Sequence, residues 1–201
     1  MKSETFTISL EKGAQDAIPF YGPGQPFGFV DEAAHNAQPE LNIFELNSGF
    51  NVPYWCASEI ITKIQQDENG CFLDSDALVK SLWKKDGAVQ PQRFIPLCFK
   101  TAVPHAGNYR VKLTLTARAE EEQFLIFHGC RHLAWKGSLR QGAVLSICFT
   151  VNISPIIPNG KDHPFEKMTL DIAVVGHCPA LDFLSVTPVE VPTVYLAGDS
   201  T

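Results

Sequence analysis

Long stretches in which apolar and polar residues alternate are the feature that most constrains the fold of this chain. In Tyr109–Thr116 every odd position is apolar and every even position is polar, and positions 145 to 153 repeat this rule. Successive side chains of a strand point to opposite faces, so this period indicates a sheet with one buried and one solvated face. We expect six successive strands, at residues 93–100, 109–117, 123–128, 143–153, 168–175 and 181–186.

The first half of the chain carries weaker signals of the same kind. We expect short strands at residues 5–10, 27–30, 41–46 and 58–64, a turn at 67–70 and one short helix at 74–83. The helix is expected because cap-like residues precede apolar residues at helical spacing. Short strands joined by Pro, Gly and Asn turns favour antiparallel pairing. The predicted fold class is therefore all-β, an antiparallel two-sheet β-sandwich of the jelly-roll kind.

Composition and charge narrow the possible partners. Of 201 residues, 45% are hydrophobic and 19% are charged, which is typical of an ordered domain. The net charge of -6 provides no basic surface for a phosphate backbone, so we expect no nucleic-acid partner. The N-terminus lacks the apolar core of a signal peptide, and no run approaches the roughly 20 apolar residues that span a bilayer. We therefore expect no membrane partner and a cytoplasmic location.

The cysteines, histidines and acidic clusters do not indicate a metal or a cofactor. Six cysteines occur singly, without a C-x-x-C pair, and we expect reduced thiols packed in the core. His128 and His132 are four residues apart, but Gly129 and strand-like flanks argue against a helical pair of metal ligands. Glu120–Glu122 is interpreted as a solvated turn. No metal and no organic cofactor are expected.

An apolar run near the end of the chain leads into Gly198, Asp199 and Ser200. A strand that ends in a tight glycine turn presents the next hydroxyl at the sheet edge, where a base and an oxyanion hole can surround it. Pro188 and Pro192 lack backbone donors and suit a stiff junction. We expect a domain boundary near residue 190, with residues 1–190 as a sandwich and 191–201 as the first strand and turn of a second domain.

The segment Thr193–Thr201 resembles the first sequence block of the SGNH, or GDSL, hydrolases, and especially the rhamnogalacturonan acetylesterase branch. In bacterial members of that branch, a sandwich resembling a galactose-binding domain often precedes the catalytic domain. Such sandwiches have an early Gly-Tyr-Gly-Phe-like element and a Gly-x-Tyr-x-Val strand midway. Pro26–Phe29 and Gly107–Val111 look similar, although Pro and Phe replace the expected Gly and Tyr in the first element.

This resemblance implies that Ser200 is the nucleophile, that its backbone N–H is one oxyanion donor, and that Asp199 shapes the turn. The further oxyanion donors and the Asp and His partners of the family would follow residue 201, in a downstream SGNH catalytic domain. The implied enzyme is a carbohydrate esterase that removes acetyl groups from a pectic rhamnogalacturonan-type substrate. Because losing a single triad member already costs about 10⁴-fold or more, we expect no esterase turnover from this chain alone.

A second candidate site is a carbohydrate contact around Trp135, with Arg131 and His132 as polar neighbours. Tryptophan rings stack on sugars, and planar or charged groups hydrogen-bond sugar hydroxyls. The partner would be a pectic oligosaccharide. Core packing of the tryptophan is the alternative. At the level of the whole chain, the alternative to the esterase is a free-standing carbohydrate- or protein-binding sandwich without enzymatic activity, in which the Gly-Asp-Ser ending is a coincidence.

Overall fold

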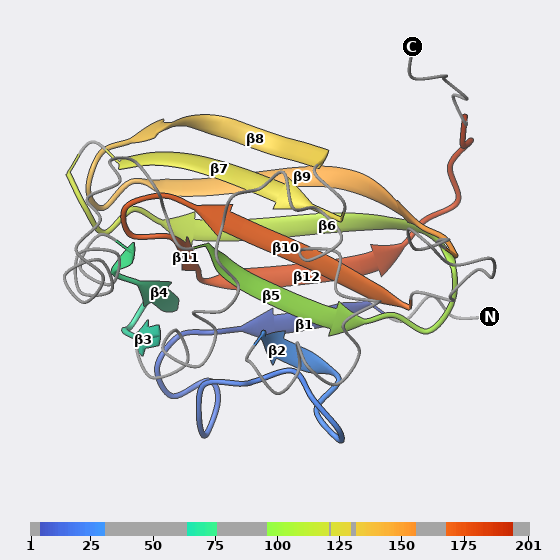
Figure 1. Cartoon of the computed structure of the whole chain (residues 1–201), viewed down its shortest axis with the longest axis horizontal. Helices are drawn as coiled ribbons and strands as arrows, with labels where there is room; N and C mark the ends of the chain where they lie inside the picture. Colours follow the sequence, from blue (N-terminus) through green and yellow to red (C-terminus); the bar gives the residue numbers. More distant parts are fainter. Residues whose placement is uncertain are drawn as a thin grey trace, which may run out of the picture.

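The protein is built from β-strands, and Figure 1 shows that the long strands run roughly along the long axis of the molecule. The computed structural model describes residues 5–30, 64–75, 96–120, 122–129, 132–155 and 168–194. Within these ranges the strands are β1 (Phe6–Ser9), β2 (Phe27–Phe29), β3 (Ile64–Gln66), β4 (Cys71–Leu73), β5 (Leu97–Ala102), β6 (Gly107–Thr116), β7 (Glu122–His128), β8 (His132–Leu139), β9 (Val144–Ile153), β10 (Thr169–Val175), β11 (Ala180–Leu181) and β12 (Phe183–Pro188).

The strands predicted from alternating residues are confirmed wherever the structure describes them. Strands β6, β7, β9, β10 and β12 match the predicted segments to within a few residues, and β1 and β2 match the two predicted in the first thirty residues. The segment 132–139, where the sequence predicts no strand, forms β8. The strand expected at 41–46, and all of 58–64 except Ile64, lie outside the described residues.

A short hairpin begins at Ile64, where β3 and β4 pair antiparallel. The predicted turn at 67–70 joins them, and Oδ1 of Asp67 accepts hydrogen bonds from the backbone N–H groups of Asn69 and Gly70, each at 2.9 Å. The helix expected at 74–83 lies outside the described residues from position 76 onward. No helix in the described part of the chain is long and apolar enough to cross a bilayer.

The longest pairing, between β6 and β9, follows directly from the alternation in the sequence. The two ten-residue strands run antiparallel from Gly107 opposite Ile153 to Thr116 opposite Val144. Odd-numbered residues of β6 such as Val111 and Leu113 are buried, whereas even-numbered ones such as Arg110 and Lys112 are exposed. Residues directly opposite each other share a face, so this register places both apolar sets in the interior.

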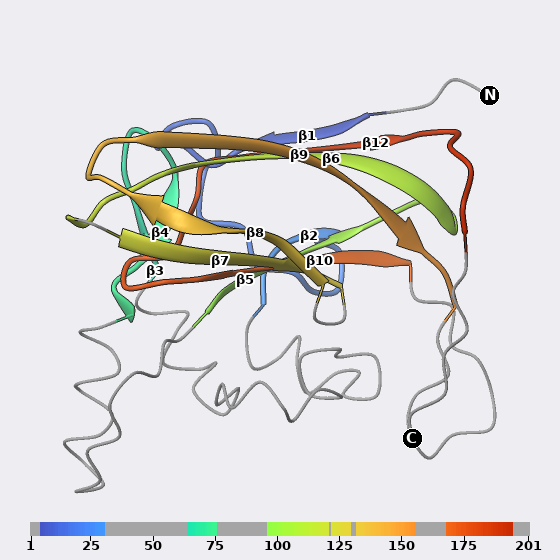
Figure 2. The ribbon, with the colours of Figure 1, turned by 90° about the horizontal axis from the view of Figure 1, so that it is seen from above.

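The sheets form a jelly roll. One sheet has the order β1-β12-β6-β9, and the other has the order β2-β5-β10-β7-β8. Every ladder between the described strands is antiparallel. Figure 2 shows the two sheets as facing layers, and the chain crosses between them from β5 to β6, β6 to β7, β8 to β9 and β9 to β10. This double Greek-key path is that of a jelly roll, and the predicted antiparallel β-sandwich is confirmed.

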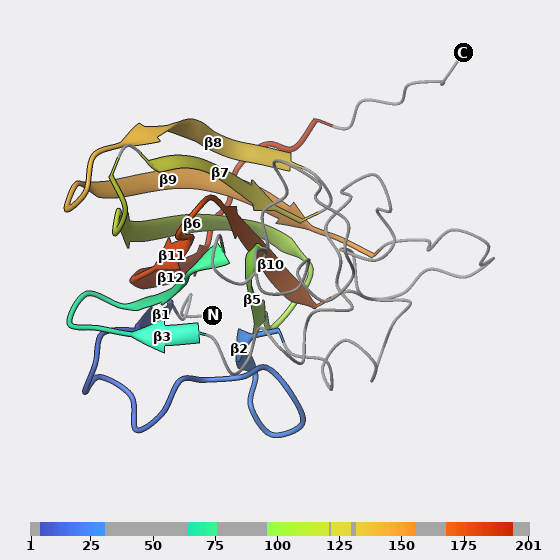
Figure 3. The same cartoon turned by 60° about the vertical axis from the view of Figure 1, so that its left-hand side comes forward.

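A third, smaller sheet with the order β11-β4-β3 lies at one end of the sandwich. Figure 3 shows β11 beside β12 and β6, and β3 near β1. Strand β11 is separated from β12 by Asp182 alone, and the backbone N–H of Asp182 donates to the carbonyl of Thr114 at 2.9 Å. The small sheet is therefore attached to the four-stranded sheet through the backbone itself.

Aromatic side chains fill much of the space between the layers. Phe29, Phe99, Phe124 and Tyr109 are among the largest fully buried side chains. The rings of Phe29 and Phe99 meet edge to face at 5.3 Å and 85°. The hydroxyl of Tyr109 donates to the carbonyl of His105 at 2.7 Å, so this buried polar atom is satisfied. Burial of each such side chain contributes about 1.5–3 kcal/mol.

Candidate functional site

The site residues predicted from the sequence lie only partly within the described structure. Ser200, with its backbone N–H, and Arg131 lie outside the described residues. His132 and Trp135 both belong to β8, the outermost strand of the five-stranded sheet. The nucleophile therefore stays a prediction, whereas the surroundings of the two β8 side chains can be described.

A β-bulge in β8 sets the direction of both side chains. Trp135 pairs with Ile126, whereas Leu133 pairs with the next residue of β7, so Ala134 is an extra residue. Two residues three positions apart on a regular strand point to opposite faces. The extra residue instead puts His132 and Trp135 on the same face, the one turned toward the four-stranded sheet.

The indole of Trp135 lies over Gly137. A Cβ atom on this glycine would lie 2.6 Å from Cζ2 and 2.7 Å from Cη2 of the indole, closer than carbon atoms approach. Trp135 is half-buried and packs against the hydrophobic core. The ring is thus held in place by its packing and by the absence of a side chain beneath it, with part of its surface left accessible.

Three aromatic rings stack beside Trp135, between the edges of the two sheets. The imidazoles of His128 and His132 lie 5.1 Å apart at 18°, and the ring of Phe149 lies 5.2 Å from His128 at 17°. His128 comes from β7 and Phe149 comes from β9, the edge strand of the four-stranded sheet. The stack therefore connects the edges of the two sheets.

Burial lowers the pKa of His128, the neighbouring His132 adds a smaller lowering, and together they bring the pKa to about 4. His128 is therefore neutral at neutral pH. A neutral imidazole can stack between two other rings without placing a charge in a half-buried position, so the low pKa and the stacked geometry are mutually consistent.

We call these four side chains, His128, His132, Trp135 and Phe149, the edge seam. They line the open long edge of the sandwich, where β8 lies beside β9 (Figure 1). The half-buried rings of His128, Trp135 and Phe149 and the exposed imidazole of His132 can supply stacking surfaces and hydrogen bonds to a small polar ring such as a sugar. The edge seam holds no carboxylate, and thus no pair of acids for hydrolysis.

The interpretation of Glu120–Glu122 as a solvated turn is wrong for Glu122, which is buried. Its carboxylate accepts hydrogen bonds from the backbone N–H groups of Cys178 and Ala119. Burial raises the pKa of Glu122, and these backbone donors oppose the shift. The residue closes the turn after β10. Three consecutive glutamates give no sign in the sequence that one of them turns inward.

An ion-pair cluster lies at the end of the sandwich that carries the small sheet. Arg118 donates from Nε and Nη2 to both carboxylate oxygens of Asp67, at 2.9 and 2.8 Å, and from Nη2 to Asp182 at 3.0 Å. Its Nη1 donates to the carbonyl of Thr116 at 2.7 Å, and the guanidinium stacks on the ring of Phe72. These contacts occupy the guanidinium, so the cluster is a structural clamp between β3–β4 and β6.

The two aspartates of this cluster respond differently to the shared arginine. Burial raises the pKa of Asp182, although Thr116 and Arg118 oppose the shift. At Asp67 burial also raises the pKa, but the hydrogen bonds from Arg118 and from backbone N–H groups outweigh it, so the pKa is lowered overall. The opposite pKa shifts follow the exposure of the two side chains, because that of Asp67 is 26% exposed and that of Asp182 is 8% exposed.

A buried ion pair lies on the outer side of the five-stranded sheet. Nζ of Lys100 is 3.3 Å from Oδ1 of Asp171, which is opposite it in the β5–β10 register. The Nζ atom also lies 5.5 Å from the centre of the Tyr21 ring. Burial raises the pKa of the nearby Cys98 thiol to about 12, so the thiol is protonated at neutral pH and is not an activated nucleophile.

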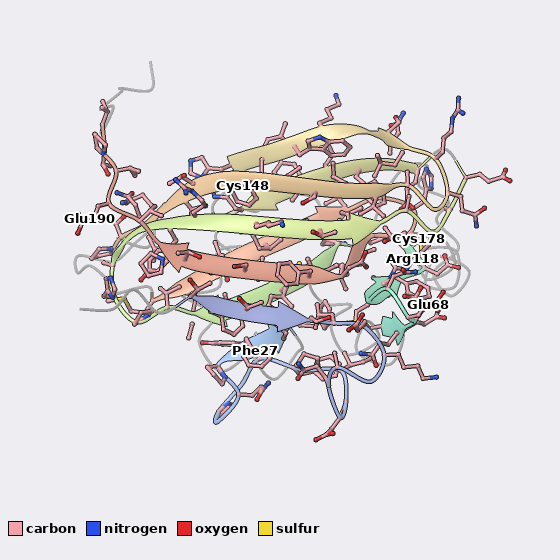
Figure 4. All side chains as sticks on the ribbon, turned by 180° about the vertical axis from the view of Figure 1, so that it is seen from behind. Phe27, Glu68, Arg118, Cys148, Cys178 and Glu190 are labelled. Carbon is pink, nitrogen blue, oxygen red and sulfur yellow. The ribbon has the colours of Figure 1, made fainter. Side chains whose placement is uncertain are left out.

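The described cysteines are all free thiols. Cys71 is buried, as expected, and burial raises the pKa values of Cys71 and Cys178 to about 12. The expectation of core packing is wrong for Cys148, which is exposed on β9 because its even-numbered position points outward (Figure 4).

Comparison with known proteins leaves the family open. No protein-family model and no curated protein matches this chain. A solved structure of the cowpea mosaic virus top component, described as naturally occurring empty particles, is similar over 48% of this chain and 58% of the viral chain. The sequence identity is 18% and the TM-score is 0.26. The alignment thus spans less than two thirds of the viral chain, and the similarity indicates nothing about function.

Proposed function

We propose that residues 1–190 are the accessory sandwich of an SGNH-type carbohydrate esterase and that residues 191–201 begin its catalytic domain. The observation that carries the proposal is the segment Thr193–Thr201, with its apolar run into Gly-Asp-Ser. The jelly roll that precedes it is the architecture that the resemblance implies for that region. The acetyl ester of a pectic rhamnogalacturonan-type chain is the proposed substrate.

The anchoring of the segment that leaves the sandwich supports this proposal. Nδ2 of Asn108 donates to the carbonyl of Val191 at 3.2 Å and to Oγ1 of Thr193 at 2.8 Å. The N–H of Val189 donates to the carbonyl of Asn108 at 2.9 Å. Nδ2 of Asn152 donates to Oδ1 of Asn108, also at 2.9 Å. The segment therefore leaves the sandwich in a fixed direction, as a scaffold for a following domain requires.

In the proposed reaction, Oγ of Ser200 attacks the carbonyl carbon of the acetyl ester, and its proton passes to a histidine of the catalytic domain. The backbone N–H of Ser200 is one donor to the oxyanion that forms. The sugar hydroxyl takes the proton and leaves, and water then releases acetate from the acyl-enzyme. These reaction steps require neither a metal nor an organic cofactor.

Esterase assays on acetylated pectin fragments and 4-nitrophenyl acetate test this proposal. The 201-residue chain is expected to show no turnover. A longer chain expressed from the full reading frame is expected to hydrolyse both substrates, and Ser200→Ala is expected to reduce its rate about 10⁴-fold or more. A longer chain whose activity is unaffected by Ser200→Ala would refute the assignment, as would turnover by the 201-residue chain that depends on Ser200.

A second candidate function is a carbohydrate-binding sandwich without catalysis, which the edge seam favours because the rings of His128, Trp135 and Phe149 are half-buried and that of His132 is exposed. Calorimetric titration with pectin oligosaccharides tests it. We expect Trp135→Ala to weaken binding, and Lys136→Ala, on the opposite face of β8, to leave binding unchanged. Absence of binding by the unmodified chain at millimolar ligand would exclude this function for the edge seam.

A further inference from the structure

The outward side of the four-stranded sheet differs in charge from the rest of the molecule. The protein carries 22 acidic and 16 basic residues. None of the strands β1, β12, β6 and β9 contains an acidic residue, whereas β6 contains Arg110 and Lys112. Both cations occupy even-numbered, exposed positions of β6, so they project from the outer face. This side of an acidic protein is locally basic.

The two cations are available to a ligand. Neither Arg110 nor Lys112 forms an ion pair or a side-chain hydrogen bond with any residue that the structure describes. By contrast, Arg118 and Lys100 have their charges neutralised by buried carboxylates. A cation without a carboxylate nearby attracts anions more strongly than one that is already paired.

Hydroxyl groups flank these cations in register. Arg110 pairs with Thr187 on one side and with Thr150 on the other, and Lys112 pairs with Ser185 and Cys148. Directly opposite residues have Cβ atoms about 5 Å apart, and alternate residues on a strand are separated by about 7 Å. Figure 4 views the molecule from this side and shows Cys148 on β9. We call Arg110, Lys112, Ser146, Thr150, Ser185 and Thr187 the outer face.

We propose that the outer face binds a linear polysaccharide that carries carboxylates, such as a chain of galacturonic acid. The cations pair with uronate carboxylates through charge-assisted hydrogen bonds, and the serine and threonine hydroxyls bond to sugar hydroxyls. The long outer face of three adjacent strands, β12, β6 and β9, suits an extended chain. The choice of a pectic ligand rests on the proposed function, because galacturonate supplies the negative charges of rhamnogalacturonan.

Titration of the 201-residue chain with polygalacturonate oligosaccharides tests the proposal. We expect binding at low salt that weakens at about 0.5 M NaCl, since screening acts on exposed charges. The double variant Arg110→Gln/Lys112→Gln is expected to weaken binding about tenfold. The matched control is Lys136→Gln/Arg140→Gln, which removes two exposed cations, one on β8 of the five-stranded sheet and one directly after it. This control is expected to bind normally. Unchanged thermal unfolding of both variants shows that folding is intact.

Three results would overturn the proposal. One is no binding of polygalacturonate by the unmodified chain at millimolar ligand. Another is an equal loss of affinity in the two double variants, which would mean that net charge alone attracts the polymer. The third is equally tight binding of single-stranded DNA of the same charge. The test needs neither Ser200 nor turnover, and Ser200→Ala is expected to bind normally, so a failed esterase assignment and a failed outer face give different results.

Discussion

At the scale of single residues, Arg118 joins several parts of the described structure through one side chain. Its guanidinium bonds two aspartates and a backbone carbonyl at the end of the sandwich. Asp182 is buried, so removing the arginine leaves a carboxylate without its cation in a poorly solvated position.

Arg118→Met is therefore expected to lower the free energy of unfolding by about 3 kcal/mol. Chemical denaturation measures the change. Arg140→Met is the control, because Arg140 is exposed and its side chain forms no ion pair with a described residue. Equal stability of the two variants would show that the cluster does not clamp the small sheet.

His128 provides a prediction about pH. Its pKa in the folded state is about 4, below its ordinary value of 6.5, so the unfolded chain binds more protons between these values. The contribution of neutral His128 to stability is complete above pH 6.5 and is lost as the pH falls toward about 4.

We expect the melting temperature of His128→Phe to fall less than that of the unmodified protein over this pH range, because phenylalanine keeps the stack and cannot be protonated. Thermal unfolding followed by circular dichroism at several pH values measures the difference. His132→Phe leaves His128 buried and is expected to retain most of the pH dependence, since burial is the larger cause of the shift. Parallel curves for His128→Phe and the unmodified protein would contradict the assignment.

At the scale of elements, β8 depends on the fit between one glycine and one indole. A Cβ atom on Gly137 would overlap the six-membered ring of Trp135. Gly137→Ala is expected to destabilise the protein by roughly 1–3 kcal/mol, because the indole must shift from its packed position. In a Trp135→Leu background, Gly137→Ala is expected to lower the stability of the protein much less.

Denaturant unfolding of the single and double variants measures the energetic coupling between Gly137 and Trp135. Gly22→Ala is the matched control, because a Cβ at Gly22 meets nothing within 4 Å and the backbone there has no positive φ. If Gly137→Ala were equally destabilising with and without Trp135, the contact would not explain the glycine.

The same strand shows where prediction from sequence succeeds and fails. Strands β6 and β9 are predictable because eight residues of β6 and nine of β9 alternate without interruption and one face of each is at least partly buried. Strand β8 is not, because Ala134 interrupts the period and the strand is exposed along much of its length. Strands β3 and β11 are too short to show a period.

The candidate sites also differ in how far they can be predicted from the sequence. Trp135 and His132 could be singled out by residue type, but only the bulge explains why they share a face. The inward turn of Glu122 and the pairing of Arg118 with Asp67 depend on contacts between segments about fifty residues apart, which no local pattern encodes.

At the scale of the whole molecule, the sandwich fixes the segment that leads toward the proposed catalytic domain. Figure 4 shows Glu190 at the end of the molecule opposite Arg118, away from the clamp. Asn108→Ala removes two side-chain hydrogen bonds to this segment. We expect cleavage after Glu190 by a glutamate-specific protease to accelerate about tenfold, with little change in global unfolding.

Proteolysis under native conditions, followed by mass spectrometry, measures this rate. Thr150→Ala, on the same sheet, is the control, since the Thr150 side chain forms no hydrogen bond to residues 189–193. Equal cleavage rates in the two variants would mean that Asn108 does not hold the exit segment.

We propose that this jelly roll is the N-terminal part of a serine esterase whose nucleophile is Ser200. The most direct test is to read the coding DNA that follows codon 201 in the native gene. If Ser200 is the nucleophile of an SGNH-type esterase, we expect an open frame that continues into a catalytic domain and encodes an Asp-x-x-His element. A stop codon immediately after codon 201 would contradict it.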